Sequence, residues 1–226
     1  MRRRTLDNAQ QAVNTVALWR FDGTTTDVVS ALETNATGFA LNSDILGCGM
    51  SKDVQSNTGI SQSISFPKMI INQYTFEFFY IGGHRNSSIF LDFMPKNEDD
   101  YPYLAMIWFS GMFEKELSIM EKHGLNDNTR LLDAYEYAAD VTADRDNPNH
   151  YAICIDIVSN AVTVWFNGVN IANVTTSNRK DNNLYLNSIR LSKEYAYYSM
   201  FYDLRVSNFI RYTENFTPPT YPLQID

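Results

Sequence analysis

The stretch of sequence that decides the fold is residues 200–219, MFYDLRVSNFIRYTENFTPP. Its first eight residues fall into two alternating sets: Met200, Tyr202, Leu204 and Val206 in one, and Phe201, Asp203, Arg205 and Ser207 in the other. A period of two is typical of a β-strand, because successive side chains point to opposite faces. The pattern therefore predicts a strand that closes a β-sheet.

A polar and aromatic tail follows this strand and reaches the double proline Pro218-Pro219. Proline has a fixed φ and no amide N–H, so neither a helix nor a central strand continues past this point. The tail is therefore predicted to lie over the fold, with Tyr212 and Phe216 as its anchors.

Similar short segments occur through the rest of the chain, separated by Gly, Asn, Ser and Asp. The clearest is 74–81, in which Tyr74, Phe76, Phe78 and Tyr80 share one face. The other predicted strands are 16–23, 38–41, 60–66, 88–94, 103–109, 111–123, 150–158, 161–166, 169–174, 184–191 and 198–206.

Three segments leave room for alternatives. Residues 24–35 fit a turn or a short strand, and 131–139 fit a strand or a short helix. Residues 111–123 also fit a helix, but their neighbours and the flanking glycines favour a strand. Segment 103–109 is almost wholly apolar, which predicts burial on both faces.

The spacing of these segments predicts a two-sheet sandwich or a barrel with about twelve to fourteen strands. A chain of 226 residues can form one such domain, and its 14 Tyr and 14 Phe suit half-buried β-surfaces. We expect a single β-sandwich over residues 15–226 and an extended arm over the polar residues 1–14.

The charge pattern argues against nucleic acid and membrane partners. The net charge is −8, which repels phosphate backbones, and the basic run Arg2-Arg3-Arg4 is too short to form a binding arm. No apolar run approaches the ~18 residues of a membrane span, and no apolar signal core follows the arginines. We expect synthesis in a cytoplasm without a signal peptide.

The sequence contains no motif of a nucleophile, a phosphate loop or a zinc protease. Its histidines, His84, His123 and His150, are dispersed, and Cys48 and Cys154 are expected to be free thiols. A glycosidase of this kind of fold would need two carboxylates flanking the bond, and the expected Glu-x-Asp-x-x-Glu motif is missing. We therefore predict that the chain is not an enzyme.

Three blocks resemble laminin-G-like domains, in the order that the family has them. They are 18–23 (LWRFDG), 150–169, and 184–191 together with the closing segment. The resemblance implies an all-β fold of the concanavalin-A-like type, a jelly-roll sandwich of two antiparallel sheets. Residues 95–147 match nothing in the family pattern.

The wording of the closing segment, RYTENFTPP, is similar to copies of this domain in bacteriophage virion proteins. This resemblance implies a structural protein of the virion, a decoration or fibre-type component of head or tail, made in the host cytoplasm. Its expected partners are other virion proteins, bound through residues 1–14, a host-surface glycan, and further copies of the chain in a homo-oligomer.

The alternative is a free carbohydrate-binding module with calcium-dependent loops. Sugars stack on exposed aromatic rings, and six tyrosines lie in or beside predicted loops: Tyr101, Tyr103, Tyr135, Tyr137, Tyr195 and Tyr197. Relatives of this type hold Ca²⁺ near loops or between the first and last strands, which implies Asp22, Asp27 and Asp203 as ligands. The competing interpretation of Asp22 is a turn cap, and that of Asp203 is a solvent-facing partner of an arginine.

Overall fold

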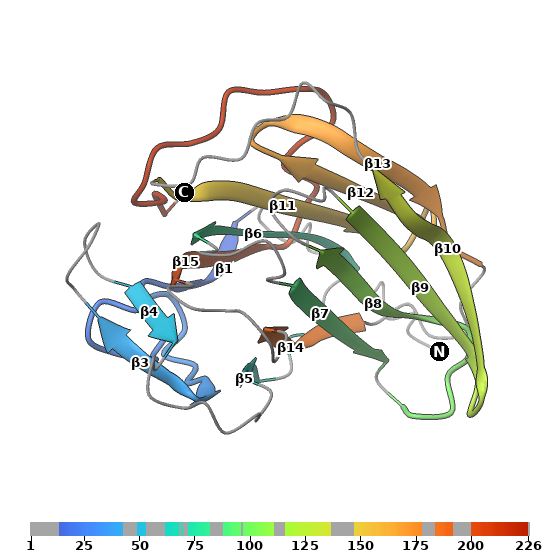
Figure 1. The fold of residues 1–226 in the computed structure, drawn as a ribbon, viewed down its shortest axis with the longest axis horizontal. Coiled ribbons are helices and arrows are strands. Elements are labelled where there is room, and N and C mark those ends of the chain that lie inside the picture. The colour runs from blue at the N-terminus through green and yellow to red at the C-terminus, as the bar shows by residue number, and fades with distance from the viewer. Residues whose placement is uncertain are drawn as a thin grey trace, which may run out of the picture.

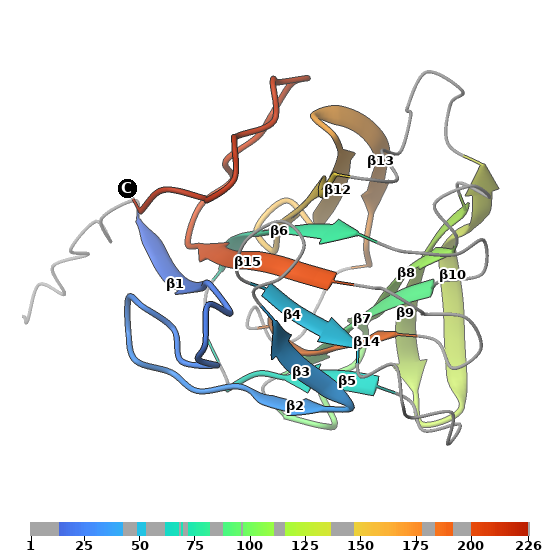
Figure 2. The ribbon, with the colours of Figure 1, turned by 60° about the vertical axis from the view of Figure 1, so that its left-hand side comes forward.

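The computed structural model describes residues 14–42, 49–52, 62–67, 69, 72–81, 88–95, 97–110, 116–136, 147–177, 184–191 and 200–225. Within these ranges the chain forms β-strands and no helix, so no helix there could cross a membrane. Two antiparallel sheets face each other as a sandwich (Figures 1 and 2). The predicted two-sheet, all-β fold is confirmed.

The larger sheet has eight strands in the order β13-β12-β11-β6-β15-β4-β3, and β1 also pairs with β15. Their bounds are β1 (Thr15–Trp19), β3 (Phe39–Asn42), β4 (Gly49–Lys52), β6 (Gln73–Ile81), β11 (Asn149–Asp156), β12 (Ala161–Phe166), β13 (Val169–Thr175) and β15 (Met200–Ser207). The predicted strands at 74–81, 150–158, 161–166, 169–174 and 198–206 are therefore confirmed to within a few residues at their ends.

The smaller sheet has seven strands in the order β10-β9-β8-β7-β14-β5-β2. Their bounds are β2 (Asn35–Thr37), β5 (Gln62–Ser65), β7 (Ser88–Pro95), β8 (Tyr103–Ser110), β9 (Glu116–Gly124), β10 (Asp127–Glu136) and β14 (Leu184–Leu191). The open choice at 131–139 resolves to a strand over its described part, and β9 and β10 form one antiparallel hairpin.

The predicted burial of segment 103–109 on both faces is wrong. In β8, Leu104, Ile107 and Phe109 face the core, whereas Met106 and Trp108 are only half-buried on the outer face. The outer face of this sheet carries apolar side chains of its own: Trp108 lies parallel to Phe90 of the neighbouring strand, with 5.8 Å between ring centroids. Apolar residues on both faces conceal the alternation in the sequence.

A β-bulge interrupts the alternation predicted for β15. The register with β6 shifts between Tyr202 and Leu204, and Asp203 has a φ of +30°. Phe201 and Leu204 consequently face the core between the sheets, while Tyr202 packs on the opposite face. One extra residue in a strand exchanges the faces of all later residues, so the predicted single face of Met200, Tyr202, Leu204 and Val206 is wrong.

Residues 208–225, here called the strap, cross the outer face of the larger sheet (Figure 1, red). Tyr212 and Phe216 pack on Ala152, Cys154 and Trp165, so their predicted role as anchors is confirmed. The two rings stack in parallel with 3.6 Å between centroids. The strap therefore acts as a third layer over part of the larger sheet.

The predicted arm lies outside the described residues except for Asn14. The amide N–H of Asn14 donates to Asn208 Oδ1 over 2.9 Å, and the amide of Asn208 donates back to the carbonyl of Asn14 over 3.2 Å. The start of the described chain is thereby held beside the start of the strap.

Candidate functional site

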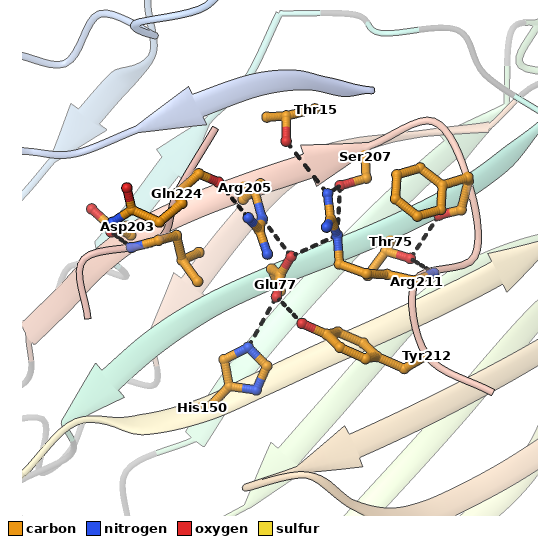
Figure 3. Close-up of polar contacts among 12 residues, drawn as sticks. Thr15, Thr75, Glu77, His150, Asp203, Arg205, Ser207, Arg211, Tyr212 and Gln224 are labelled. Carbon is orange, nitrogen blue, oxygen red and sulfur yellow. Dashed lines mark hydrogen bonds and ion pairs between the residues drawn. The ribbon is translucent and has the colours of Figure 1, made fainter. Parts of the chain in front are cut away.

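One buried carboxylate, Glu77 in the middle of β6, holds the strap to the sheet. Its Oε1 accepts from Arg205 Nε at 2.6 Å and lies 3.2 Å from Arg211 Nε. Its Oε2 accepts from the hydroxyl of Tyr212 at 2.7 Å and lies 3.1 Å from His150 Nε2. Figure 3 shows these four side chains converging on Glu77 from β11, β15 and the strap.

The charge of Glu77 is stabilised by these contacts. Burial by itself disfavours the charged form, but the hydrogen bond from His150 and the positive charge of Arg205 outweigh it and lower the pKa of Glu77 to about 2. Burial and the neighbouring Glu77 charge raise the pKa of the Tyr212 phenol above its usual value. Tyr212 therefore remains a hydroxyl donor to a carboxylate at neutral pH.

Thr75, two residues before Glu77 on the same face of β6, holds the first turn of the strap. Its hydroxyl donates to the carbonyl of Phe209 at 2.8 Å and accepts from the amide of Arg211 at 2.9 Å. Cys154 lies beside it with its Sγ 3.5 Å from the same hydroxyl. Burial raises the pKa of the Cys154 thiol, which keeps it protonated.

Asp203, at the bulge of β15, holds the other end of the strap. Its Oδ2 accepts from the amide of Leu223 at 2.6 Å and from Arg20 Nη1 at 2.9 Å. Burial raises the pKa of Asp203 to about 6 despite these two contacts, and the charge of nearby Asp22 adds to the rise. The predicted arginine partner of Asp203 is present and is Arg20. The Asp203 side chain, however, is fully buried and does not face solvent.

We expect the stability of the protein to depend on the ionisation of Asp203. A pKa raised from 3.8 to about 6 means that the folded state binds a proton that the unfolded state releases. The free energy of unfolding should therefore fall by up to about 3 kcal/mol as the pH rises from 4 to 7. Urea unfolding of wild type and of Asp203→Asn across this pH range measures the fall in the free energy of unfolding. The variant should not show the part of the fall that comes from the ionisation of Asp203. Parallel pH profiles in the two proteins would contradict it.

A groove of about 220 Å³ lies on the outer face of the larger sheet, between the sheet and the strap. The antiparallel register sets Cys154, Thr163 and Asn173 in a row across β11, β12 and β13. The full lining is Cys154, Asp156, Ser159, Ala161, Thr163, Trp165, Asn170, Asn173, Ile210, Tyr212 and Thr213. Three strands thus form its floor, and the strap forms its wall.

The groove offers polar side chains that the described part of the protein does not use. The side chains of Thr163, Asn170, Asn173 and Thr213 form no hydrogen bond within the described part of the chain. Hydroxyl and amide groups both donate and accept hydrogen bonds. Together with the apolar surface of Ala161 and Ile210, the groove can bind a small polar molecule that has some apolar faces.

The wall of the groove depends on a close approach at the turn between β12 and β13. The backbone N–H of Phe216 donates to the carbonyl of Gly168 at 2.9 Å. The backbone N–H of Asn170 donates to Asn215 Oδ1 at 3.0 Å. Gly168 has a φ of +79°, and a Cβ atom there would lie 1.9 Å from the Phe216 carbonyl oxygen. Only glycine allows the strap to lie this close.

Two of the six candidate tyrosines are described in full, and they do not line the groove. Tyr101 is half-buried and Tyr103 is buried; their rings stack with 5.6 Å between centroids, and Lys122 Nζ lies 6.0 Å from each. Tyr135 is described only as part of the backbone of β10, and Tyr137, Tyr195 and Tyr197 lie outside the described residues. Sugar binding by this set stays a prediction.

The three candidate calcium ligands have different surroundings. Asp27 is buried, and its carboxylate accepts from the amides of Leu18, Val29 and Ser30, so it caps a turn. Asp22 is exposed, and Asp203 bonds to Arg20 and the strap. Over the described part of the chain, no group of three or more His, Cys, Asp or Glu side chains gathers to hold a metal ion.

Glu77 and the groove are the features that sequence reasoning missed. A signal for Glu77 was present, since it is the one charged residue in the aromatic run YTFEFFYI of residues 74–81. A charge in the middle of a strongly aromatic strand implies a partner that compensates it. The groove had no such signal, because Asn170, Asn173 and Thr163 are ordinary residues of exposed strand positions.

No known family model matches the chain, and no curated protein matches it. Among solved structures, domain 4 of AbnA, a GH43 extracellular arabinanase from Geobacillus stearothermophilus, solved in complex with arabinotriose, matches with a TM-score of 0.56 and 16% identity. The match covers 88% of this chain and 94% of that domain.

Two binding domains match with similar TM-scores. The binding domain of Paraclostridial Mosquitocidal Protein 1 gives a TM-score of 0.59 at 11% identity, over 88% of this chain and 49% of that one. The binding domain of Botulinum Neurotoxin DC, solved in complex with SialylT, gives a TM-score of 0.57 at 12% identity, over 87% of this chain and 48% of that one. The chain thus spans about half the length of these two binding domains. At such identities the likeness establishes the fold, a β-sandwich that also occurs in carbohydrate-binding domains.

Proposed function

We propose that the protein is a glycan-binding β-sandwich module whose ligand lies in the groove between β11–β13 and the strap. The observation that carries this proposal is the set of unused amide and hydroxyl side chains in one groove. Each hydroxyl of a sugar donates and accepts hydrogen bonds, and its C–H faces pack on apolar surface. The groove offers both kinds of contact to one small ligand.

The solved structures support this choice of ligand class. Domain 4 of the arabinanase was solved with arabinotriose, the neurotoxin DC binding domain with SialylT, and the serotype D ligand binding domain with N-acetylneuraminic acid. These are ligands of those proteins. They support a sugar for this chain because the same fold presents strands and loops on which such a site can form.

Binding without catalysis is part of the proposal. Hydrolysis of a glycosidic bond in most families needs two carboxyl groups about 5–9.5 Å apart across the sugar. Asp156 is the one carboxylate among the described residues that line the groove. This supports a module that holds a glycan and leaves it unchanged.

The first test replaces the two groove asparagines. Asn170→Ala and Asn173→Ala each remove hydrogen-bonding groups that have no partner among the described residues, so the fold should be retained. We expect each variant to bind about three- to tenfold more weakly to whichever glycan the wild type captures from an immobilised library. Biolayer interferometry on that glycan measures the change.

Asn35→Ala is the matched control, because Asn35 is an exposed asparagine on β2 of the other sheet. It should leave binding unchanged. A library in which the wild type binds no glycan, or in which all three variants bind equally well, would overturn the proposal.

A virion component that binds other virion proteins through residues 1–14 is a second proposal, supported by the likeness of the RYTENFTPP segment to phage copies. Its expected location is the phage particle. Mass spectrometry of purified particles from the source should detect the chain in constant proportion to the major structural proteins. Its absence from particles would remove this proposal and leave the glycan-binding module unaffected.

A further inference from the structure

The charges around the groove are unbalanced. Asp156 is the one carboxylate among its described lining residues, and none of these residues carries a positive charge. The remaining polar residues are neutral amides and hydroxyls. Within the described lining, a ligand therefore meets one negative charge and no compensating cation.

Two described arginines in or beside the strap, Arg211 and Arg205, already have partners of their own. Arg211 precedes the groove residue Tyr212, but its guanidinium points to Glu77 and to the hydroxyl of Ser207, at 2.8 Å from Nη2. Arg205 is divided between Glu77 and the carbonyl of Gln224. Figure 3 shows both guanidinium groups in the Glu77 cluster beneath the strap. Turning either guanidinium to a ligand would remove one of the contacts that hold the buried Glu77 carboxylate.

Asp156 is fixed in its charged form. Its Oδ1 accepts from the amide of Val158 at 2.9 Å and from that of Ser159 at 3.3 Å, in the turn that joins β11 to β12. Burial opposes its ionisation, but hydrogen bonds from Ser159 and Val158 prevail and lower the pKa of Asp156. The charge is therefore present at any pH at which the protein would normally act.

We propose that the groove selects uncharged sugars and rejects sugars that carry a carboxylate or a sulfate. The proposal rests on the proposed glycan-binding function and names the class of ligand. An anionic sugar would be brought beside the Asp156 carboxylate with no arginine or lysine in the described lining to pair with it, and like charges placed together at an interface strongly disfavour binding. The net charge of −8 adds repulsion at longer range.

The size of the groove also limits how large a ligand it can hold. About 220 Å³ is less than the roughly 300–1,000 Å³ of pockets that enclose drug-sized ligands. The groove therefore accommodates a terminal sugar unit, and the rest of a longer glycan would extend along the strap. A single charge on that terminal unit would then lie within the groove, close to Asp156.

The test uses the full chain and an array on which each neutral oligosaccharide is printed beside its sialylated, sulfated or uronic acid counterpart. Lactose with sialyllactose, and oligogalactosides with oligogalacturonides, are two such pairs. We expect the wild type to bind neutral members at least about tenfold more strongly than their charged partners. The discrimination should decrease at high salt, which screens the Asp156 charge.

Asp156→Asn is the decisive variant, because an asparagine can keep the Oδ1 acceptor for the backbone amides of the turn while it removes the negative charge. The readout is the ratio of neutral to charged binding, which should fall about tenfold in the variant. Equal thermal unfolding of variant and wild type establishes that the fold is preserved. Stronger wild-type binding to the charged members, or discrimination unchanged in Asp156→Asn, would overturn the inference and leave glycan binding intact. Binding to no member of either class would overturn the proposed function itself.

Discussion

Replacing Glu77 with glutamine should destabilise the protein by about 3–5 kcal/mol, the usual cost of removing one partner from a buried ion pair. The side chain is fully buried, and it bonds to Arg205, Arg211, His150 and Tyr212. Glutamine has nearly the same shape but no charge, so the buried Arg205 and the partly exposed Arg211 would lose the Glu77 charge as a partner. Urea unfolding followed by circular dichroism measures the loss.

The pH dependence of the same variant gives a second measurement. The pKa of Glu77 is lowered from 4.5 to about 2, so its contribution is complete above pH 4.5 and disappears as the pH falls towards 2. The shift corresponds to about 3 kcal/mol. On acidification from pH 4.5 towards 2, wild type should lose this part of its free energy of unfolding, and Glu77→Gln should not. This pH range differs from that of Asp203, whose ionisation changes the stability between pH 4 and 7.

Asp92→Asn is the matched control for charge removal. Asp92 pairs with Arg190 at 2.6 Å, but the side chains are 20% and 43% exposed. Solvent screens such a pair, and its loss should cost less than about 1 kcal/mol. Equal losses in Glu77→Gln and Asp92→Asn would show that the Glu77 cluster does not hold the strap as its geometry indicates.

Replacing Gly168 with alanine should displace the middle of the strap and destabilise the protein by about 2–4 kcal/mol. The new Cβ would lie 1.9 Å from the carbonyl oxygen of Phe216 and 3.0 Å from Pro218 Cδ. The strap would have to move away, and the Phe216 ring would lose its packing on Trp165, now at 5.6 Å between centroids. The fluorescence of Trp165, limited proteolysis of the strap and urea unfolding should all report the change.

This substitution also tests the groove. Because the strap is the wall of the groove, Gly168→Ala should weaken glycan binding although residue 168 does not line it. Normal binding with a demonstrably loosened strap would show that the wall contributes nothing to the ligand.

Two other glycines are controls for Gly168→Ala. Gly23 has a φ of +103° and open space around its Cα, so Gly23→Ala measures backbone strain alone, about 1–2 kcal/mol. Gly124 has a φ that other residues adopt and only an ordinary contact with Asp127 at 3.8 Å. Gly124→Ala should be nearly neutral. A loss in Gly168→Ala no larger than that in Gly23→Ala would contradict the proposed clash.

The RYTENFTPP segment, residues 211–219, docks the strap on the larger sheet. Arg211 and Tyr212 bond to Glu77, Asn215 bonds to the amide of Asn170, and Phe216 packs on Trp165. The residues of this closing motif are therefore those that dock the strap. Their pattern predicted anchoring correctly because aromatic residues in a segment without its own hydrogen-bond partners must bury their rings against something else.

The sequence by itself determined the all-β fold, most of the described strands and the two anchors of the strap, although β4 was not predicted. These follow from local periodicity and from proline and glycine, whose effects act within a few residues. Only the tertiary structure decided the bulge at Asp203, the cluster around Glu77 and the groove. The partners of Glu77 lie 73, 128 and 135 residues away, at His150, Arg205 and Tyr212. Which of many polar side chains meet across such distances depends on sheet order and register, which are set by the packing of the whole chain.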